Sequence, residues 1–163
     1  MSVLSVIHDK MVDIDALLMR LAHWRLKNQK IVFTNGCFDI IHRGHIEYLA
    51  LTANKGDRLV IGLNTDNSVK LNKGPNRPLN DENSRALALS ALSFVDAVLL
   101  FDDKTPETII EKIKPDVLAK GADYDKKSVV GANFVESYGG KVELIPMTEG
   151  YSTTALINKI NET

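Results

Sequence analysis

Apolar residues follow two patterns along this chain. Short apolar runs typical of strands alternate with segments in which apolar residues recur at helical spacing. Short apolar, β-rich runs predict strands at residues 31–34, 58–63, 97–101, 116–119 and 142–145. Apolar residues at helical spacing predict helices at residues 12–27, 46–53, 83–94, 106–113 and 128–138, and a last helix that carries Leu156, Ile157 and Ile160. Repeated units of this kind predict an α/β fold with one doubly wound, mostly parallel sheet and helices on both faces.

The length and the loops indicate where a ligand would bind. A chain of 163 residues suits one hydrophobic core, and we divide it into an N-terminal helical extension, residues 1–29, and a main domain, residues 30–163. Ligands of doubly wound sheets bind beyond the carboxyl ends of the strands. Polar loops leave those ends at residues 35–44, 64–81, 121–127 and 147–154. Because the loop at 64–81 is longer than usual connections, we expect it to be functional or mobile.

Composition and charge exclude several classes of protein. The chain carries 20 Lys and Arg against 21 Asp and Glu, a formal net charge of −1, so it lacks the basic excess of nucleic-acid-binding proteins. Its single cysteine, Cys37, cannot form an internal disulfide, and the N-terminus lacks the pattern of a secretory signal. No apolar run approaches the roughly 20 residues that span a bilayer. We therefore expect a cytoplasmic protein with no membrane or nucleic-acid partner.

The loop after the first strand contains the residues with the clearest chemistry. His42 and His45 lie where this loop enters a helix, and Gly44 leaves space between them. A helix N-terminus offers free N–H groups and a positive dipole end, so a polyphosphate can bind there while two imidazoles donate to its oxygens. The alternatives are a surface histidine pair or two metal ligands, although the remaining ligands of a zinc site are missing.

Other polar residues have both a functional and a structural interpretation. Lys73 and Arg77 could close over phosphates, or they could belong to a solvated loop. Arg85 lies early in a helix, where a cation is unfavourable unless an anion is close, so it could bind substrate or form an ordinary salt bridge. Asp39 could accept a hydrogen bond from a substrate hydroxyl or help to hold magnesium, or it could brace its own loop. Ser152, Thr153 and Thr154 could cap the last helix, grip a phosphate, or do both.

The longer motif resembles that of a known family. Residues 36–45 read Gly-Cys-Phe-Asp-Ile-Ile-His-Arg-Gly-His, and this segment resembles the G-x-F-D-x-x-H-x-G-H signature of the cytidylyltransferase-like nucleotidyltransferases, which have a Rossmann-like fold. Within that family the chain is most similar to the heptose-1-phosphate adenylyltransferases of lipopolysaccharide-core biosynthesis, through residues 33–36, 73–78, 120–124 and 150–154. The resemblance covers about residues 30–161 and includes no sugar-kinase domain.

The resemblance implies a reaction and a set of site residues. ATP and a sugar 1-phosphate, with D-glycero-D-manno-heptose 1-phosphate as the leading acceptor, would give an ADP-sugar and pyrophosphate, with Mg²⁺ bridging the triphosphate oxygens. The expected catalytic residues are His42, His45 and Lys73. The expected nucleotide-binding residues are Cys37, Phe38, Gly44, Gly121, Asp123, Ser152, Thr153 and Thr154, and the expected substrate-binding residues are Asp39, Arg77 and Arg85. Asp123 has a turn-capping alternative and Cys37 an alternative as a small apolar residue. The resemblance also implies a homodimer.

Three other functions stay open. Glycerol-3-phosphate cytidylyltransferase, which uses CTP, shares the histidine motif, but here Met147 stands in place of its arginine and Cys37 in place of its threonine. A nucleotide-binding regulatory module without turnover is the second alternative. The third is a relic of a class I tRNA synthetase, which the absence of a K-M-S-K-S-like loop and of a basic excess disfavours.

Overall fold

A single parallel sheet organises the molecule, seen here in a computed structural model that describes residues 2–148 and 150–161. In these residues six strands pair in the order β1-β4-β3-β2-β5-β6, and every neighbouring pair is parallel. The strands are β1 Met11–Val12, β2 Ile31–Gly36, β3 Arg58–Asn64, β4 Ala97–Phe101, β5 Val117–Gly121 and β6 Lys141–Ile145. Because the chain moves from β2 outward to β3 and β4 and then returns to β5, the strand order reverses between β2 and β5. Ligands of such sheets bind at that reversal.

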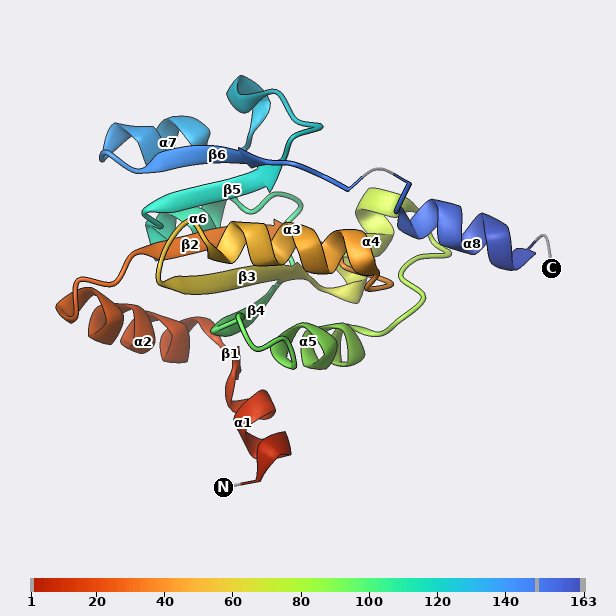
Figure 1. Ribbon diagram of the computed structural model, residues 1–163, viewed down its shortest axis with the longest axis horizontal. Coiled ribbons are helices and arrows are strands. Elements are labelled where there is room, and N and C mark those ends of the chain that lie inside the picture. The colour runs from red at the N-terminus through yellow and green to blue at the C-terminus, as the bar shows by residue number, and fades with distance from the viewer. Residues whose placement is uncertain (1, 149, 162–163) are drawn as a thin grey trace.

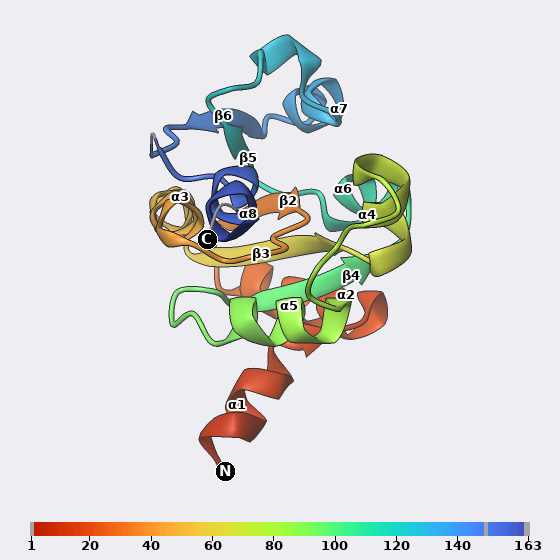
Figure 2. The ribbon, with the colours of Figure 1, turned by 90° about the vertical axis from the view of Figure 1, so that its right-hand side faces the viewer.

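Helices cover both faces of the sheet. They are α1 Val3–Asp9, α2 Ile14–Leu26, α3 Arg43–Ala53, α4 Asp66–Lys73, α5 Glu82–Ser90, α6 Glu107–Ile113, α7 Ala132–Ser137 and α8 Thr153–Asn161, with a short 3₁₀ turn at Lys126–Ser128. The strands run toward α8 and α4, which lie beyond their carboxyl ends (Figure 1). In the view along the strands, α3 and α6 lie on opposite sides of β2 and β3 (Figure 2). The expected doubly wound α/β fold is confirmed.

The period-two pattern of the strands divides the core between the two faces. Ile31 and Phe33 of β2 pack with apolar residues of α2, α6 and α7. Val32, between them, points to the other face and packs with residues of α3 and α5. All three side chains are fully buried. Alternate residues of a strand point to opposite faces, so one apolar run contributes to both halves of the core.

The structure corrects several expected elements. Residues 64–81 were expected to form one long loop, but α4 occupies Asp66–Lys73 within them. Thr65 caps this helix by accepting a hydrogen bond from the backbone N–H of Ser68. Of its apolar residues only Val69 is buried, which is why helical periodicity gave little signal there. The helix expected at 83–94 ends at Ser90, and the one expected at 128–138 begins only at Ala132.

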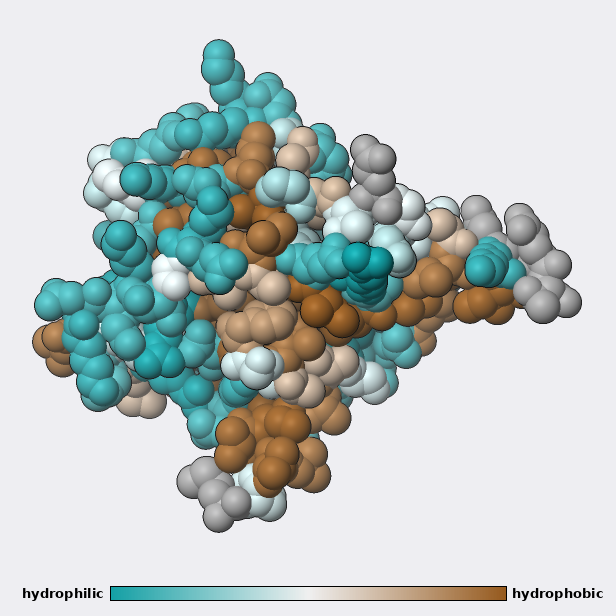
Figure 3. All heavy atoms as spheres, viewed as in Figure 1, coloured by the Kyte–Doolittle hydropathy of each residue, from teal (hydrophilic) through white to brown (hydrophobic). Residues whose placement is uncertain are grey.

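The N-terminal part contains two elements that periodicity missed. Residues 12–27 were expected to form one helix, but β1 takes up Val12 and α2 begins at Ile14, capped by the carboxylate of Asp13. A two-residue edge strand is too short to show alternation, and α1, before it, buries none of its residues. Apolar side chains therefore gather on the surface of α1 (Figure 3). No helix among the described residues is long and apolar enough to cross a bilayer.

Candidate functional site

A cleft of about 490 Å³ opens at the carboxyl ends of β2, β3 and β5, at the reversal of strand order. Segments distant in sequence converge on it, from the loops after these strands and from α4, the 104–106 segment and the start of α8. Its lining residues are Asn35, Gly36, Cys37, Phe38, Asp39, His45, Asn64, Val69, Asn72, Lys73, Arg77, Lys104, Pro106, Lys120, Tyr124, Thr153 and Thr154.

The lining is strongly cationic for its size. It contains the side chains of Lys73, Arg77, Lys104 and Lys120, whereas the only carboxylate among its described lining residues, Asp39, is paired with Arg77. Hydroxyl and amide groups of Thr153, Thr154, Asn35, Asn64 and Asn72 add hydrogen-bonding capacity. A hollow with several cations and few anions attracts an anionic ligand, and phosphate groups suit lysine and arginine donors.

A smaller hollow of about 210 Å³ continues the cleft on the side of β5. It shares seven lining residues with the larger one, namely Asn35, Gly36, Cys37, Phe38, His45, Lys120 and Tyr124. Its other residues are less polar overall and include Tyr48, Gly121, Asp123 and Met147. An added Cβ at Gly121 would lie 2.5 Å from the Asp123 carboxylate and 3.2 Å from Met147 Sδ, so a larger residue there would displace these side chains. The two hollows together offer a polar, cationic part and a part of lower polarity, as a nucleoside polyphosphate requires.

The two histidines of the sequence motif form one unit at the start of α3. Their rings stack with centroids 3.8 Å apart and planes inclined by 21°. His42 is the N-cap of α3, and its Nδ1 accepts a hydrogen bond of 3.4 Å from the backbone N–H of His45. An Nδ1 that accepts must be unprotonated, so neutral His42 carries its proton on Nε2. Only His45 lines the cleft directly, and His42 lies behind it.

Burial keeps both imidazoles neutral in the ligand-free protein. It lowers the pKa of His45 to about 4, with a further decrease from neighbouring His42, and it also lowers the pKa of His42. Within the described part of the chain, Nδ1 of His45 has no hydrogen-bond partner. Because solvent does not reach this atom, it does not face a ligand in the cleft, and His45 would meet a phosphate through its other ring nitrogen, Nε2.

The segment before α8 packs on the start of α3. The Thr148 hydroxyl donates to Glu47, and the Arg43 guanidinium donates to the Tyr151 hydroxyl at 3.4 Å. An added Cβ at Gly44 would lie 3.0 Å from Tyr151 Cβ and 3.2 Å from the His42 ring. Gly44 therefore permits the close approach that brings this segment, and with it Thr153 and Thr154, to the cleft.

Asp39 braces the loop between α4 and α5. Its buried carboxylate accepts from the Arg77 guanidinium at 2.6 Å and from the backbone N–H groups of Leu79 and Asn80 at 2.8 and 3.0 Å. The side-chain amide of Asn80 donates in turn to the backbone carbonyl of Asp39. The bracing interpretation thus has direct support, although both Asp39 and Arg77 also line the cleft.

Arg85 lies beneath the cleft rather than in its wall. It is 1% exposed, and its guanidinium donates to the carbonyls of Asn80 and Cys37 and to the Asp66 carboxylate at 2.7 Å. The anion that offsets its unfavourable helix position is therefore Asp66. The salt bridge is buried at its arginine end and partly exposed at Asp66, a geometry that favours a positioning role for Arg85.

The structure brings most of the expected residues together. The two hollows are lined by His45, Lys73, Cys37, Phe38, Asp39, Arg77, Gly121, Asp123, Thr153 and Thr154. Four others lie outside these walls. His42 and Gly44 support His45, Arg85 is buried below, and the Ser152 hydroxyl accepts from the Ala155 N–H at 3.0 Å and so caps α8. Lys73 lies in the last turn of α4, where its charge also favours the helix.

The sequence interpretation included the polar residues at the strand ends in its loops and motifs but gave them no role. Asn35 and Lys120 are the penultimate residues of β2 and β5, Asn64 is the last residue of β3, and all three line the cleft. Lys104 and Tyr124 join them from neighbouring loops. The sequence shows these residues as polar positions at or next to the end of an apolar run. Because the carboxyl ends of parallel strands meet at one edge of a sheet, such positions could have been predicted to lie at the ligand site.

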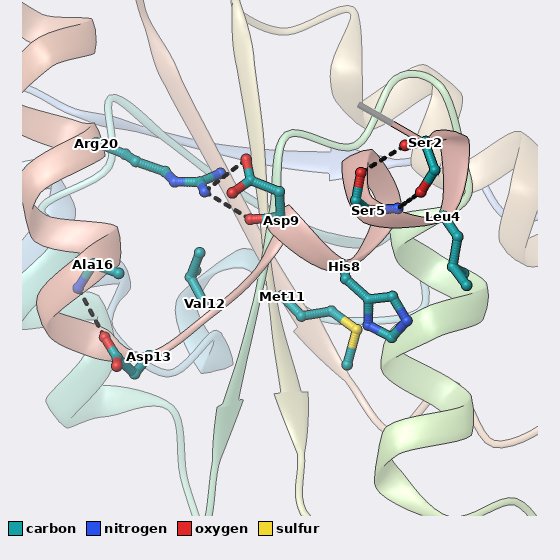
Figure 4. A pocket seen from close by; sticks show the side chains of 10 residues that line it. All are labelled: Ser2, Leu4, Ser5, His8, Asp9, Met11, Val12, Asp13, Ala16 and Arg20. Carbon is teal, nitrogen blue, oxygen red and sulfur yellow. Dashed lines mark hydrogen bonds and ion pairs between the residues drawn. The ribbon is translucent and has the colours of Figure 1, made fainter.

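A hollow of about 680 Å³ lies far from this edge, between α1, β1 and α2 (Figure 4). It lies against α1, whose apolar side chains are exposed. Most of its charged side chains already form an ion pair or cap a helix. Arg20 pairs with Asp9 at 3.0 Å, and Asp13 caps α2. Because it lacks the group of free cations found at the strand ends, it does not fit the polyphosphate chemistry of the histidine motif.

Comparison with known proteins relates the chain to one family. A family model described as cytidylyltransferase-like matches residues 33–159. The chain is 53% identical over 152 residues to the bifunctional protein HldE of Methylobacillus flagellatus, covering 93% of this chain and 31% of that protein. It is 50% identical over 153 residues to the protein of the same name from Caulobacter sp., covering 94% and 31%. The chain thus spans about a third of the length of these curated relatives.

Two solved structures share the fold. The lipopolysaccharide core biosynthesis protein of Thermoplasma volcanium is 31% identical, with a TM-score of 0.61, over 76% of this chain and 99% of that one. The pantoate-β-alanine ligase of Francisella tularensis, solved with a β,γ-ATP compound and β-alanine, has a TM-score of 0.60 at 16% identity, over 94% and 78% of the two chains. The second likeness concerns the fold alone.

Proposed function

Because the chain belongs to the cytidylyltransferase-like family, we propose that it is a nucleotidyltransferase that moves AMP from ATP to a sugar 1-phosphate, giving an ADP-sugar and pyrophosphate. The acceptor that we propose is D-glycero-D-manno-heptose 1-phosphate. The observation that carries the proposal is the cationic cleft at the reversal of strand order, with His45 and the start of α3 at its edge. The cytidylyltransferase-like family model supports nucleotidyl transfer, and the similarity to a lipopolysaccharide core biosynthesis protein fits a sugar phosphate as acceptor.

The transfer is a single in-line displacement. An oxygen of the acceptor phosphate forms a bond to the α-phosphorus of ATP while the bond from that phosphorus to the bridging oxygen of pyrophosphate breaks. The acceptor phosphate is already ionised at neutral pH, so no general base is required, and catalysis rests on positioning and on neutralising charge. His45 would donate to the phosphate oxygens and His42 would hold its ring in position, while Lys73 and Arg77 would neutralise the departing pyrophosphate.

We propose that Mg²⁺ enters with the triphosphate. Among residues 2–148 and 150–161, no group of three or more His, Cys, Asp and Glu side chains could hold a metal ion. Magnesium commonly keeps several waters and binds phosphate oxygens with few protein ligands, so the chemistry of this cleft suits an ion carried by ATP. When bound, it would neutralise part of the charge on the polyphosphate.

The activity of the protein would be tested by the release of pyrophosphate. The purified chain would be given ATP or CTP, with D-glycero-D-manno-heptose 1-phosphate or glycerol 3-phosphate as acceptor, and the sugar nucleotide would be identified by mass spectrometry. We expect product with ATP and the heptose phosphate. Turnover with CTP and glycerol 3-phosphate alone would favour the cytidylyltransferase alternative. Tight ATP binding without product from any acceptor would favour a regulatory module. The homodimer and the cytoplasmic location stay predictions of the sequence.

A further inference from the structure

Lys120 occupies the point where the strand order reverses. It lies near the end of β5, and its Nζ donates to the backbone carbonyl of Asn35 at 3.2 Å and to the side-chain oxygen of the same residue, at the end of β2. The Tyr124 ring lies below the ammonium group, with its centroid 5.7 Å away. These contacts hold the charge at the floor of the cleft, between the two strands where ligands of this fold bind.

The charge of Lys120 lacks an anionic partner. No carboxylate of the described residues forms an ion pair with it, and it is partly buried. Burial lowers its pKa to about 8, while the neighbouring Cys37 and Asp123 act in the opposite direction. Placing an ammonium group here is therefore costly without a ligand, and an anion that filled the cleft would offset the cost.

The position of Lys120 also relates it to one phosphate in particular. Lys120 and His45 line both the cationic cleft and the less polar hollow beside it. If the nucleoside occupies the less polar hollow and pyrophosphate lies among Lys73, Arg77 and Lys104, the α-phosphate that joins them lies at the junction. Charge develops on the oxygens of that phosphate during the transfer, and a donor already in place there stabilises the transition state.

We propose that Lys120 is a further catalytic residue, which donates a hydrogen bond to a non-bridging oxygen of the α-phosphate while the nucleotidyl group is transferred. This inference rests on the proposed function. It assigns to β5 a role in the chemical step, beyond the histidine motif and the lysine of α4. The competing interpretation is that Lys120 only braces Asn35 and so holds the ends of β2 and β5 together.

The test compares Lys120→Met with wild type and with Lys127→Met. Methionine keeps much of the length and volume of lysine without its charge, and Lys127 is an exposed lysine outside both hollows. We expect Lys120→Met to lower kcat by about a hundredfold with a smaller change in KM for ATP, whereas Lys127→Met stays close to wild type. A second variant, Lys120→Gln, keeps a donor without the charge and replaces the first if that one does not fold.

A sulfur substitution separates contact with the α-phosphate from bracing. The rates with ATP and with each diastereomer of ATPαS are measured for wild type and for the variants. If Lys120 touches a non-bridging oxygen, sulfur at that position slows wild type more than it slows Lys120→Met. Equal sulfur effects in both proteins, or an unchanged kcat in the variant, would overturn the inference. If wild type itself released no pyrophosphate with any nucleotide, the proposed function would fail instead, and the two failures are thus distinguishable.

Discussion

His42 and His45 hold one another in place at the start of α3, with their rings stacked 3.8 Å apart and the Nδ1 of the first accepting from the backbone N–H of the second. The stack fixes the orientation of His45, the member that lines the cleft. It also disfavours two positive charges, so the ligand-free pair is neutral and donates through N–H groups. One histidine thus faces the ligand and the other positions it.

Replacement of His45 by Gln should lower kcat without unfolding the protein. Loss of one positioned donor at the reacting phosphate typically costs on the order of 10²–10³ in rate. The measurement is kcat from pyrophosphate release, together with the midpoint of urea unfolding. His23→Gln, on the exposed face of α2, is the matched control and should change neither. Near-normal turnover of His45→Gln would remove the mechanism proposed for this residue.

The pair of histidines also predicts how stability depends on pH. The folded protein lowers the pKa of His45 from 6.5 to about 4, so between these values the unfolded chain binds a proton that the folded chain does not. Stability from this group is therefore present above pH 6.5 and is lost as the pH falls toward 4. With allowance for its partial exposure, we expect a loss of about 1 kcal/mol between pH 7 and pH 5. Urea unfolding of wild type and His45→Gln at both pH values measures it, and an equal slope in the two proteins would contradict it.

The Asp39 carboxylate should matter more for stability than its partner Arg77. Asp39→Ala leaves the part-buried backbone N–H bonds of Leu79 and Asn80 without their acceptor and Arg77 without its anion, so we expect a loss of about 2–3 kcal/mol. Arg77→Ala keeps both backbone bonds of Asp39 and should cost only about 1 kcal/mol. Equal losses, measured by urea unfolding, would show that the ion pair and not the backbone bracing holds this loop.

The sequence predicts those elements that are stabilised by burying apolar residues at a regular spacing. Buried strands such as β3 and amphipathic helices such as α6 show their period directly, and both were found within one or two residues. The strand β1 and the helix α4 were missed because each buries few side chains of its own. Such elements are stabilised by helix caps and by pairing at the sheet edge. These interactions leave no hydrophobic periodicity in the sequence from which the element could be predicted.

The candidate site was predictable only where its residues are contiguous. The histidine motif and the segment before α8 lie in single stretches of sequence, so each could be found alone. Lys120 and Asn35 are 85 residues apart, and only the order of strands in the sheet makes them neighbours. For Arg85 the sequence leaves substrate contact and a salt bridge open, because it does not show that Asp66 and two carbonyl groups contact its guanidinium.

The docking of the C-terminal segment should affect substrate binding. Glu47 accepts from the Thr148 hydroxyl and pairs with Arg43, which in turn donates to Tyr151. Glu47→Gln weakens these contacts without emptying the cleft, so we expect KM for ATP to rise by about three- to tenfold, roughly 1 kcal/mol of binding, with a smaller change in kcat. Glu143→Gln, which removes an exposed ion pair with Lys55, is the control. An unchanged KM in Glu47→Gln would indicate that this contact does not hold Thr153 and Thr154 in the site.

Lys120→Met should make the ligand-free protein more stable while it makes the enzyme slower. The folded protein lowers the pKa of Lys120 from 10.5 to about 8, so at pH 7 folding holds a proton on a group whose surroundings disfavour the charge. Removing that group should raise the free energy of unfolding by about 1 kcal/mol after allowance for partial exposure, and the gain should shrink as the pH rises from 8 toward 10.5. ATP should then stabilise wild type more than the variant, because only wild type gains the missing anion. Urea unfolding at pH 7 and pH 9.5, with and without ATP, measures both effects. A variant less stable than wild type at pH 7 would mean that the bonds to Asn35 outweigh the cost of the charge, which is the behaviour of a bracing lysine.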